Sequence, residues 1–182
     1  SWDERVYLPW LTAAAALDSG KVTPSTTFED PGYCIEYGKK VFNFADQSGP
    51  EVFGTVTFAQ ALEHSINAVF CDVGKELGAR AVLDQAKKFG FYEPPPLETP
   101  DGERYPSGLY RNHLLWYPSR DQQVDAGRMA SGQERLLVTP LQMAMVAGGT
   151  GNAGIVMRPW VVQKVVSPQG KTVSRTRPER LD

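Results

Sequence analysis

Residues 57–77 read TFAQALEHSINAVFCDVGKEL, and this stretch decides the fold. Ser65 and Asn67 interrupt an apolar pattern that recurs every three or four residues, the spacing of one buried helix face: Phe58, Leu62, Ile66, Val69, Phe70, Val73 and Leu77. Residues two apart on one helix point away from each other, so these two polar side chains can serve one cleft only if the helix breaks between them. The stretch therefore predicts two helices with Ser65-Ile66-Asn67 at their junction. The alternative is that Ser65 and Asn67 form an ordinary helix end and N-cap.

Size and composition restrict the class of protein. The chain has 182 residues, 41% of them hydrophobic, which is enough for one domain with a substantial core or for two small subdomains. Its 19 basic and 21 acidic residues give a formal net charge of -2, and this balance argues against a nucleic-acid partner. No apolar run approaches the roughly 20 residues that a membrane-spanning helix needs, so we expect any membrane anchor to lie outside this sequence.

Cys34 and Cys71 are the only cysteines, and their spacing matches no metal-ligand motif. We therefore expect no metal site. Two cysteines can form a disulfide in an oxidising compartment, or both can remain buried thiols, since free cysteine behaves as a small hydrophobic residue. The sequence leaves both alternatives open.

Helices are also predicted on either side of the central stretch. Residues 11–17 are strong helix formers followed by Asp18-Ser19-Gly20, and residues 79–89 show a helical apolar pattern followed by Gly90. Thr139 is a predicted N-cap, followed by Pro140 at the first helical position. Residues 141–147 are apolar on nearly every side and predict an interior helix that ends at the glycines from position 148 onward.

The remaining segments predict loops and strands. Residues 21–56 are expected to form loops with short strands such as 41–44 and little other regular structure. Residues 91–125 contain many prolines and are expected to form a long, mostly irregular excursion. This excursion is either a functional surface or a surface loop without a function of its own. From residue 155 onward, paired valines around the turn at residues 167–170 predict a β-hairpin.

Three separated motifs together resemble the transpeptidase domain of class B penicillin-binding proteins, especially their actinobacterial members. They are the Ser-Ile-Asn triplet within ALEHSINAVFCDVG at residues 61–74, SGQERLLVTPLQMAMVAGGTGNAG at 131–154, and MRPWVV at 157–162. They occur in the order found in that family. TAAAALDSG at residues 12–20 extends the match toward the N-terminal end, so the resemblance covers most of the chain.

The resemblance implies a fold class of α/β (α+β) type, the penicillin-binding transpeptidase or serine β-lactamase-like fold. Residues 1–182 would form a partial transpeptidase domain. Residues 1–154 would be a mainly helical subdomain with long loops, and residues 155–182 a hairpin belonging to an antiparallel sheet.

The function implied by the resemblance is peptidoglycan D,D-transpeptidation through a serine acyl-enzyme. In that family a serine made nucleophilic by a lysine one helical turn away attacks a D-Ala-D-Ala stem peptide, and β-lactam antibiotics acylate the same serine. Ser65 would correspond to the proton-relay serine and Asn67 to the substrate-binding asparagine. No metal or organic cofactor is implied. The expected location is the extracytoplasmic face of the cell membrane, with membrane proteins of the divisome or elongation complex as further partners.

The sequence departs from the family pattern at two motifs. No serine is followed three residues later by lysine, and Val6 and Pro9 stand where the nucleophile and its lysine are expected. Gly170-Lys171-Thr172-Val173 superficially resembles the third motif, Lys-Thr/Ser-Gly, but lacks its second glycine, so we interpret Lys171 as a turn-flanking surface residue. We therefore expect the nucleophile and Lys-Thr-Gly segments to be missing from this chain, and this chain alone to be inactive.

Three explanations of these departures remain open. The chain is a piece of a longer active enzyme, a catalytically inactive homologue that acts as a partner-binding module, or a fragment comprising one subdomain. The partner-binding module would use the 91–125 excursion as its surface. A β-lactam sensor or hydrolase is a further alternative. His64 is next to Ser65 and cannot face it on a helix, so we interpret it as a surface or packing histidine rather than a catalytic base.

Overall fold

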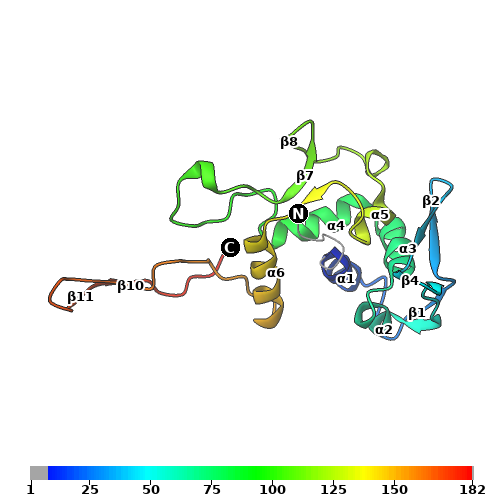
Figure 1. The fold of residues 1–182 in the computed structure, drawn as a ribbon, viewed down its shortest axis with the longest axis horizontal. Helices are drawn as coiled ribbons and strands as arrows, with labels where there is room; N and C mark the ends of the chain where they lie inside the picture. Colours follow the sequence, from blue (N-terminus) through cyan, green and yellow to red (C-terminus); the bar gives the residue numbers. More distant parts are fainter. Residues whose placement is uncertain (1–7, 182) are drawn as a thin grey trace. The chain divides into compact units, whose positions relative to one another are not determined.

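The computed structural model describes residues 8–181, and these form two compact units. The first unit contains the residues up to 88 together with 109–137. The second contains residues 89–108 together with those from 138 onward. Figure 1 traces the chain through both units.

Helix α3 (Asn67–Leu77) is the central element of the first unit. It packs against α1 (Leu8–Asp18), α4 (Ala79–Lys88) and α5 (Ala126–Ala130), and it follows the short α2 (Phe58–Glu63) directly. Phe70 and Cys71 of α3 are fully buried, and the Phe70 ring lies 5.7 Å from that of Phe58. The predicted pair of helices is therefore confirmed, and the apolar stripe of the central stretch supplies much of the core of this unit.

Three short antiparallel pairs precede α2, in the segment where loops with short strands were expected. Strand β1 (Thr27–Asp30) pairs with β6 (Gly54–Thr57), β2 (Tyr33–Glu36) with β3 (Lys39–Phe42), and β4 (Ala45–Asp46) with β5 (Gly49–Pro50). The structure contains such strands, but the sequence indicated the place of only one, because strands of two to four residues are too short to show an alternating pattern. The strand expected at residues 41–44 lies at Lys39–Phe42.

The excursion at 91–125 is largely irregular, as predicted, but it contains one hairpin. Strand β7 (Gly108–Arg111) lies between β8 (Leu114–Leu115) and β9 (Leu136–Leu137) in a three-stranded sheet. Asn112 and His113 connect β7 to β8 with φ angles of 51° and 63°, the left-handed values that a two-residue hairpin turn requires. Two 3-10 turns, η2 (Asp101–Glu103) and η3 (Asp121–Gln123), complete the excursion.

Helix α6 (Pro140–Gly151) belongs to the second unit and begins as predicted. The Thr139 hydroxyl accepts a hydrogen bond from the Gln142 N–H at 3.1 Å, and Pro140 occupies the first turn. The helix continues through Gly148 and Gly149 and ends at Gly151, one of the glycines that were expected to terminate it. A Cβ at Gly149 would lie 3.0 Å from Val156 Cγ2, so close packing accounts for a glycine inside this helix.

The prediction of an interior helix, which rested on apolar residues on nearly every side of α6, is wrong. Its buried positions form one face, while small side chains occupy exposed positions on the other. The buried residues are Gln142, Met145, Val146 and Gly149, and the exposed ones include Ala144 and Ala147. Apolar composition without a clear period did not distinguish an interior helix from one covered on a single face.

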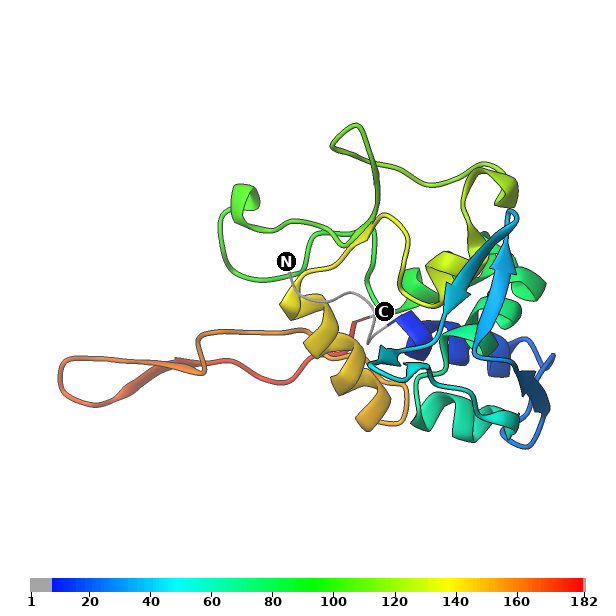
Figure 2. The same cartoon turned by 45° about the vertical axis from the view of Figure 1, so that its right-hand side comes forward.

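The predicted C-terminal hairpin is confirmed. Strand β10 (Lys164–Val166) pairs antiparallel with β11 (Thr172–Arg175), and Gly170 in the connecting turn has a φ of 80° (Figure 2). After the hairpin the chain returns alongside residues 156–158, where the Arg158 N–H donates to the Glu179 carbonyl at 2.8 Å. Within residues 8–181, every helix is too short or too polar to cross a lipid bilayer.

Candidate active site

The Ser65-Ile66-Asn67 junction is a tight turn between α2 and α3. Ser65 has a φ of 52°, a left-handed conformation that is uncommon for a residue with a side chain, and it reverses the direction of the chain. Ile66 is 1% exposed, whereas Ser65 is exposed and Asn67 is half-buried. The turn therefore places the two polar side chains at the surface on either side of a buried isoleucine. The N-cap position belongs to Ile66, so Asn67 is not the N-cap considered as an alternative.

Hydrogen bonding fixes one end of the Asn67 amide and leaves the other end accessible. Asn67 Nδ2 donates to the Phe42 carbonyl of β3 at 2.9 Å. Within residues 8–181, the Asn67 Oδ1 atom and the Ser65 hydroxyl have no hydrogen-bond partner. An exposed hydroxyl beside an oriented carboxamide can donate to or accept from a bound peptide.

Asn43 completes the start of α3, and sequence reasoning did not identify it. Its Oδ1 accepts from the Ala68 N–H at 2.9 Å, and its Nδ2 donates to both carboxylate oxygens of Asp30 at 2.9 Å. Asp30 also accepts from the backbone N–H groups of Gly32 and Phe53. One signal in the sequence points to such a contact. Ile66 stands at the N-cap, and an isoleucine side chain has no acceptor for the first helical N–H groups, so a residue from elsewhere must supply one.

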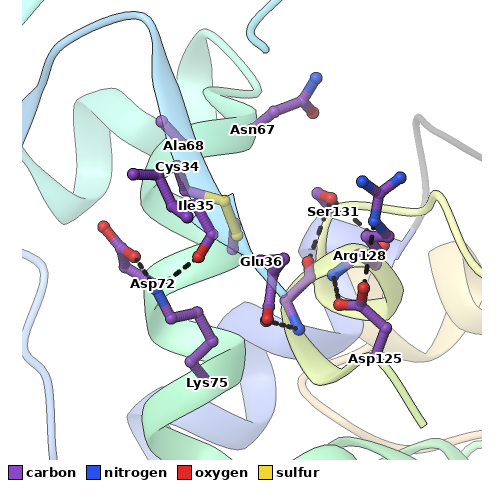
Figure 3. Close-up of a disulfide and its surroundings, with 12 residues drawn as sticks. Cys34, Ile35, Glu36, Asn67, Ala68, Asp72, Lys75, Asp125, Arg128 and Ser131 are labelled. Atoms are coloured by element: carbon purple, nitrogen blue, oxygen red, sulfur yellow. Dashed lines mark hydrogen bonds and ion pairs between the residues drawn. A yellow bond between two sulfur atoms is a disulfide. The ribbon is translucent and has the colours of Figure 1, made fainter. Parts of the chain in front are cut away.

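A disulfide between Cys34 of β2 and Cys71 of α3 ties the β2–β3 hairpin to this helix (Figure 3). The two Cα atoms are 6.3 Å apart, and both residues are buried. This decides between the two alternatives left open for the cysteines. Among the described residues, Cys34, Cys71 and Asp72 form a group of potential metal ligands, but sulfurs joined in a disulfide provide no thiolate.

A group of charged side chains lies beside the disulfide (Figure 3). Glu36 is buried, and its Oε1 accepts from the Gly127 N–H at 2.9 Å. Burial raises the pKa of Glu36, and the nearby carboxylate of Asp125 raises it further. Asp125 caps α5 by accepting from the backbone N–H of Arg128 at 2.9 Å, and it forms an ion pair with the Arg128 side chain at 3.0 Å.

The other residues singled out in the sequence lie as follows. The His64 ring stacks on Phe53 with ring centres 5.0 Å apart, which fits a packing histidine. Lys171 is exposed beside the hairpin turn, as expected. Pro9 is buried in the first turn of α1. Val6 lies outside the described residues.

Comparisons with known proteins agree with this arrangement. Residues 10–181 match the penicillin binding protein transpeptidase domain family. Over 93% of its own length, this chain is 30% identical to peptidoglycan D,D-transpeptidase PbpA of Mycolicibacterium smegmatis. The structure superimposes on penicillin-binding protein A from M. tuberculosis, in a penicillin G acyl-enzyme complex, with a TM-score of 0.79, 26% identity and 98% of this chain covered.

A D,D-transpeptidase domain from Eggerthella lenta gives a TM-score of 0.76 at 26% identity, with 99% of this chain covered. The chain spans about a third of the length of the curated relatives, since it covers 33% of the M. smegmatis protein. It covers 39% of the M. tuberculosis chain and 44% of the E. lenta chain. The fold is of the mixed α/β transpeptidase type, and the chain belongs to the penicillin-binding protein transpeptidase domain family.

Proposed function

We propose that this protein is a serine D,D-transpeptidase that cross-links peptidoglycan and is acylated by β-lactams. The observation that carries the proposal is the Ser65-Ile66-Asn67 turn, where a hydroxyl with no hydrogen-bond partner among residues 8–181 and a carboxamide fixed at one end lie at the surface on either side of a buried isoleucine. Membership of the transpeptidase family and the acyl-enzyme complexes of the M. tuberculosis relative support it.

In the proposed reaction a nucleophilic serine adds to the carbonyl carbon of the penultimate D-Ala of a stem peptide. The amide bond to the terminal D-Ala breaks, and D-alanine leaves with the proton taken from the serine. An amine on a neighbouring strand then attacks the serine ester, and the serine recovers a proton. Ser65 relays protons in these steps, and Asn67 binds the peptide amide of the stem.

The nucleophile is not assigned to a residue of this chain, because neither Val6 nor Pro9 carries a hydroxyl or an amine. We therefore propose that these residues provide the Ser-x-Asn part of the active site. The substrate places the reaction outside the cytoplasmic membrane. Protein partners of the cell-wall synthesis machinery are part of the same proposal.

Intact mass spectrometry of the full-length protein incubated with benzylpenicillin tests the proposal. We expect one covalent adduct per chain. General acid–base groups contribute about a hundredfold or more to rate, so Ser65→Ala is expected to slow acylation by about that factor, and Asn67→Ala is expected to slow it through lost orientation.

His64→Ala is the matched control, because His64 is an exposed neighbour of Ser65 whose ring stacks on Phe53. Its acylation rate is expected to stay within about twofold of wild type, since the His64 side chain is exposed and has no part in the proposed reaction. A folded full-length protein that forms no adduct would contradict the enzyme proposal and favour the partner-binding module. Unchanged rates in both active-site variants would overturn the roles of Ser65 and Asn67.

A further inference from the structure

Helix α3 begins without a capping residue of its own. The first N–H groups of any helix lack partners inside that helix, and a serine, threonine, aspartate or asparagine at the N-cap normally accepts from one of them. Here the N-cap is Ile66, whose side chain is buried and carries no acceptor. Ala68 is only 1% exposed, so its N–H needs a partner from elsewhere in the protein.

Asn43 supplies that partner from 25 residues away in the sequence. It follows directly on strand β3 and is 5% exposed. Its carboxamide orientation is determined by three acceptors for Nδ2, namely the two oxygens of Asp30 at 2.9 Å and the Glu51 carbonyl at 3.0 Å. Because the NH2 group faces Asp30 and Glu51, the Oδ1 atom of Asn43 must face the start of α3.

A second hydrogen bond joins the neighbours of Asn43 and Ala68, namely Phe42 and Asn67. Asn67 Nδ2 donates to the Phe42 carbonyl at 2.9 Å, so the last residue of the hairpin and the residue directly after it contact two consecutive residues at the start of α3. Two such bonds restrict both the position of the first turn and the direction of the Asn67 carboxamide. The Cys34–Cys71 disulfide joins the same hairpin to the next turn of the helix.

We propose that Asn43 is a positioning residue for the active-site turn, acting through the Ala68 N–H and held in place by Asp30. It does not touch substrate. It fixes the first turn of α3 so that Ser65 and Asn67 present their polar groups together. The inference rests on the proposed function for its effect on acylation, but its effect on the turn itself is independent of that function.

Asn43→Ala in the full-length protein tests the inference with two separate measurements. The first is amide hydrogen exchange at Ala68, followed by NMR, which requires no activity. The second is the second-order rate constant of acylation by benzylpenicillin. A lost helix cap is worth about 1 kcal/mol, so we expect roughly five- to tenfold faster exchange at Ala68 and a similar loss in acylation rate.

Val82→Ala is the control for a general loss of stability. Val82 is 1% exposed in α4 and makes no hydrogen bond to the turn. Removing two buried methyl groups costs an amount comparable to a lost cap or more. This variant is expected to acylate within about twofold of the wild-type rate at temperatures where it remains folded, because general destabilisation does not move the turn.

The paired variant Asp30→Asn with Asn43→Asp keeps the inference testable if Asn43→Ala fails to fold. The pair exchanges the charged and the neutral partner, so a carboxamide NH2 still meets a carboxylate and an oxygen at position 43 still faces Ala68. Asparagine at position 30 can accept from only one of the Gly32 and Phe53 N–H groups, and aspartate at position 43 no longer donates to the Glu51 carbonyl. Asn43→Asp alone places two carboxylates in contact and is expected to show the greater loss. The pair is therefore expected to recover part of the exchange protection and acylation that Asn43→Asp loses.

Each outcome has a defined meaning. Wild-type exchange at Ala68 in Asn43→Ala overturns the positioning role, and so does failure of the paired variant to improve on Asn43→Asp alone. Faster exchange with an unchanged acylation rate overturns the link to activity. Absence of acylation in the wild-type protein contradicts the proposed function, while the exchange measurement still decides whether Asn43 fixes the turn.

Discussion

Breaking the Cys34–Cys71 disulfide is expected to lower the free energy of unfolding by about 4 kcal/mol. The bond closes a loop with a sequence separation of 37 residues. In the chain-entropy description, a cross-link of this length removes about 13 cal/mol/K from the unfolded chain, which is about 4 kcal/mol at 25 °C. With a urea m-value of about 2 kcal/mol/M, the midpoint of unfolding should fall by about 2 M.

The assay compares one protein in two redox states. Both cysteines are buried, so the protein is reduced in denaturant with a phosphine, refolded in the same reductant, and titrated with urea beside the oxidised form. The variant with both Cys34→Ala and Cys71→Ala serves as the control, because its urea midpoint should not respond to the reductant. The m-value should also rise on reduction, since the unfolded chain becomes less compact. A difference below about 1 kcal/mol between the redox states would refute the argument, because it would leave the loop constraint without its predicted effect.

Substitutions at three further positions have defined outcomes. Gly127→Ala should lower stability by about 1–3 kcal/mol in thermal unfolding, because a Cβ there would overlap Glu36 and Cys71. Glu36 has a raised pKa in the folded state, so the stability of the wild-type protein should fall as pH rises from the ordinary carboxyl pKa of 4.5 through the raised pKa. Glu36→Gln keeps an acceptor for the Gly127 N–H and should make the urea midpoint of unfolding independent of pH in that range. Thr139→Ala removes the side-chain cap of α6 and should cost about 1 kcal/mol in the same titration, whereas Thr139→Ser should not.

The helices and the junction were predictable because their signals are local. An apolar stripe with helical spacing indicated α2 and α3, and two polar residues two positions apart required a break between them. A threonine followed by proline fixed the start of α6, and valine pairs around a turn fixed the last hairpin. Each of these features depends on residues within one or two turns of each other.

The contacts that support the site were not predictable in the same way. Asn43 meets Ala68 only because β3 ends beside α3, and the sequence does not reveal which distant residue will cap a helix. The disulfide had the same difficulty, since two cysteines 37 residues apart are equally compatible with free thiols. Short strands were expected before α2, but their pairing and most of their positions were not predicted, because strands of two to four residues are too brief for their alternation to be recognised.

The buried isoleucine at the centre of the turn has a consequence for protein engineering. Ile66 takes no part in the proposed chemistry, yet its side chain connects the outward-facing pair, Ser65 and Asn67, to the core of the first unit. A larger or smaller residue at position 66 would overpack this core or leave a cavity in it, and the turn would shift as its support relaxes. Both polar groups would then move together while keeping their chemical identity. Position 66 therefore connects the packing of the core to the reactivity of the site.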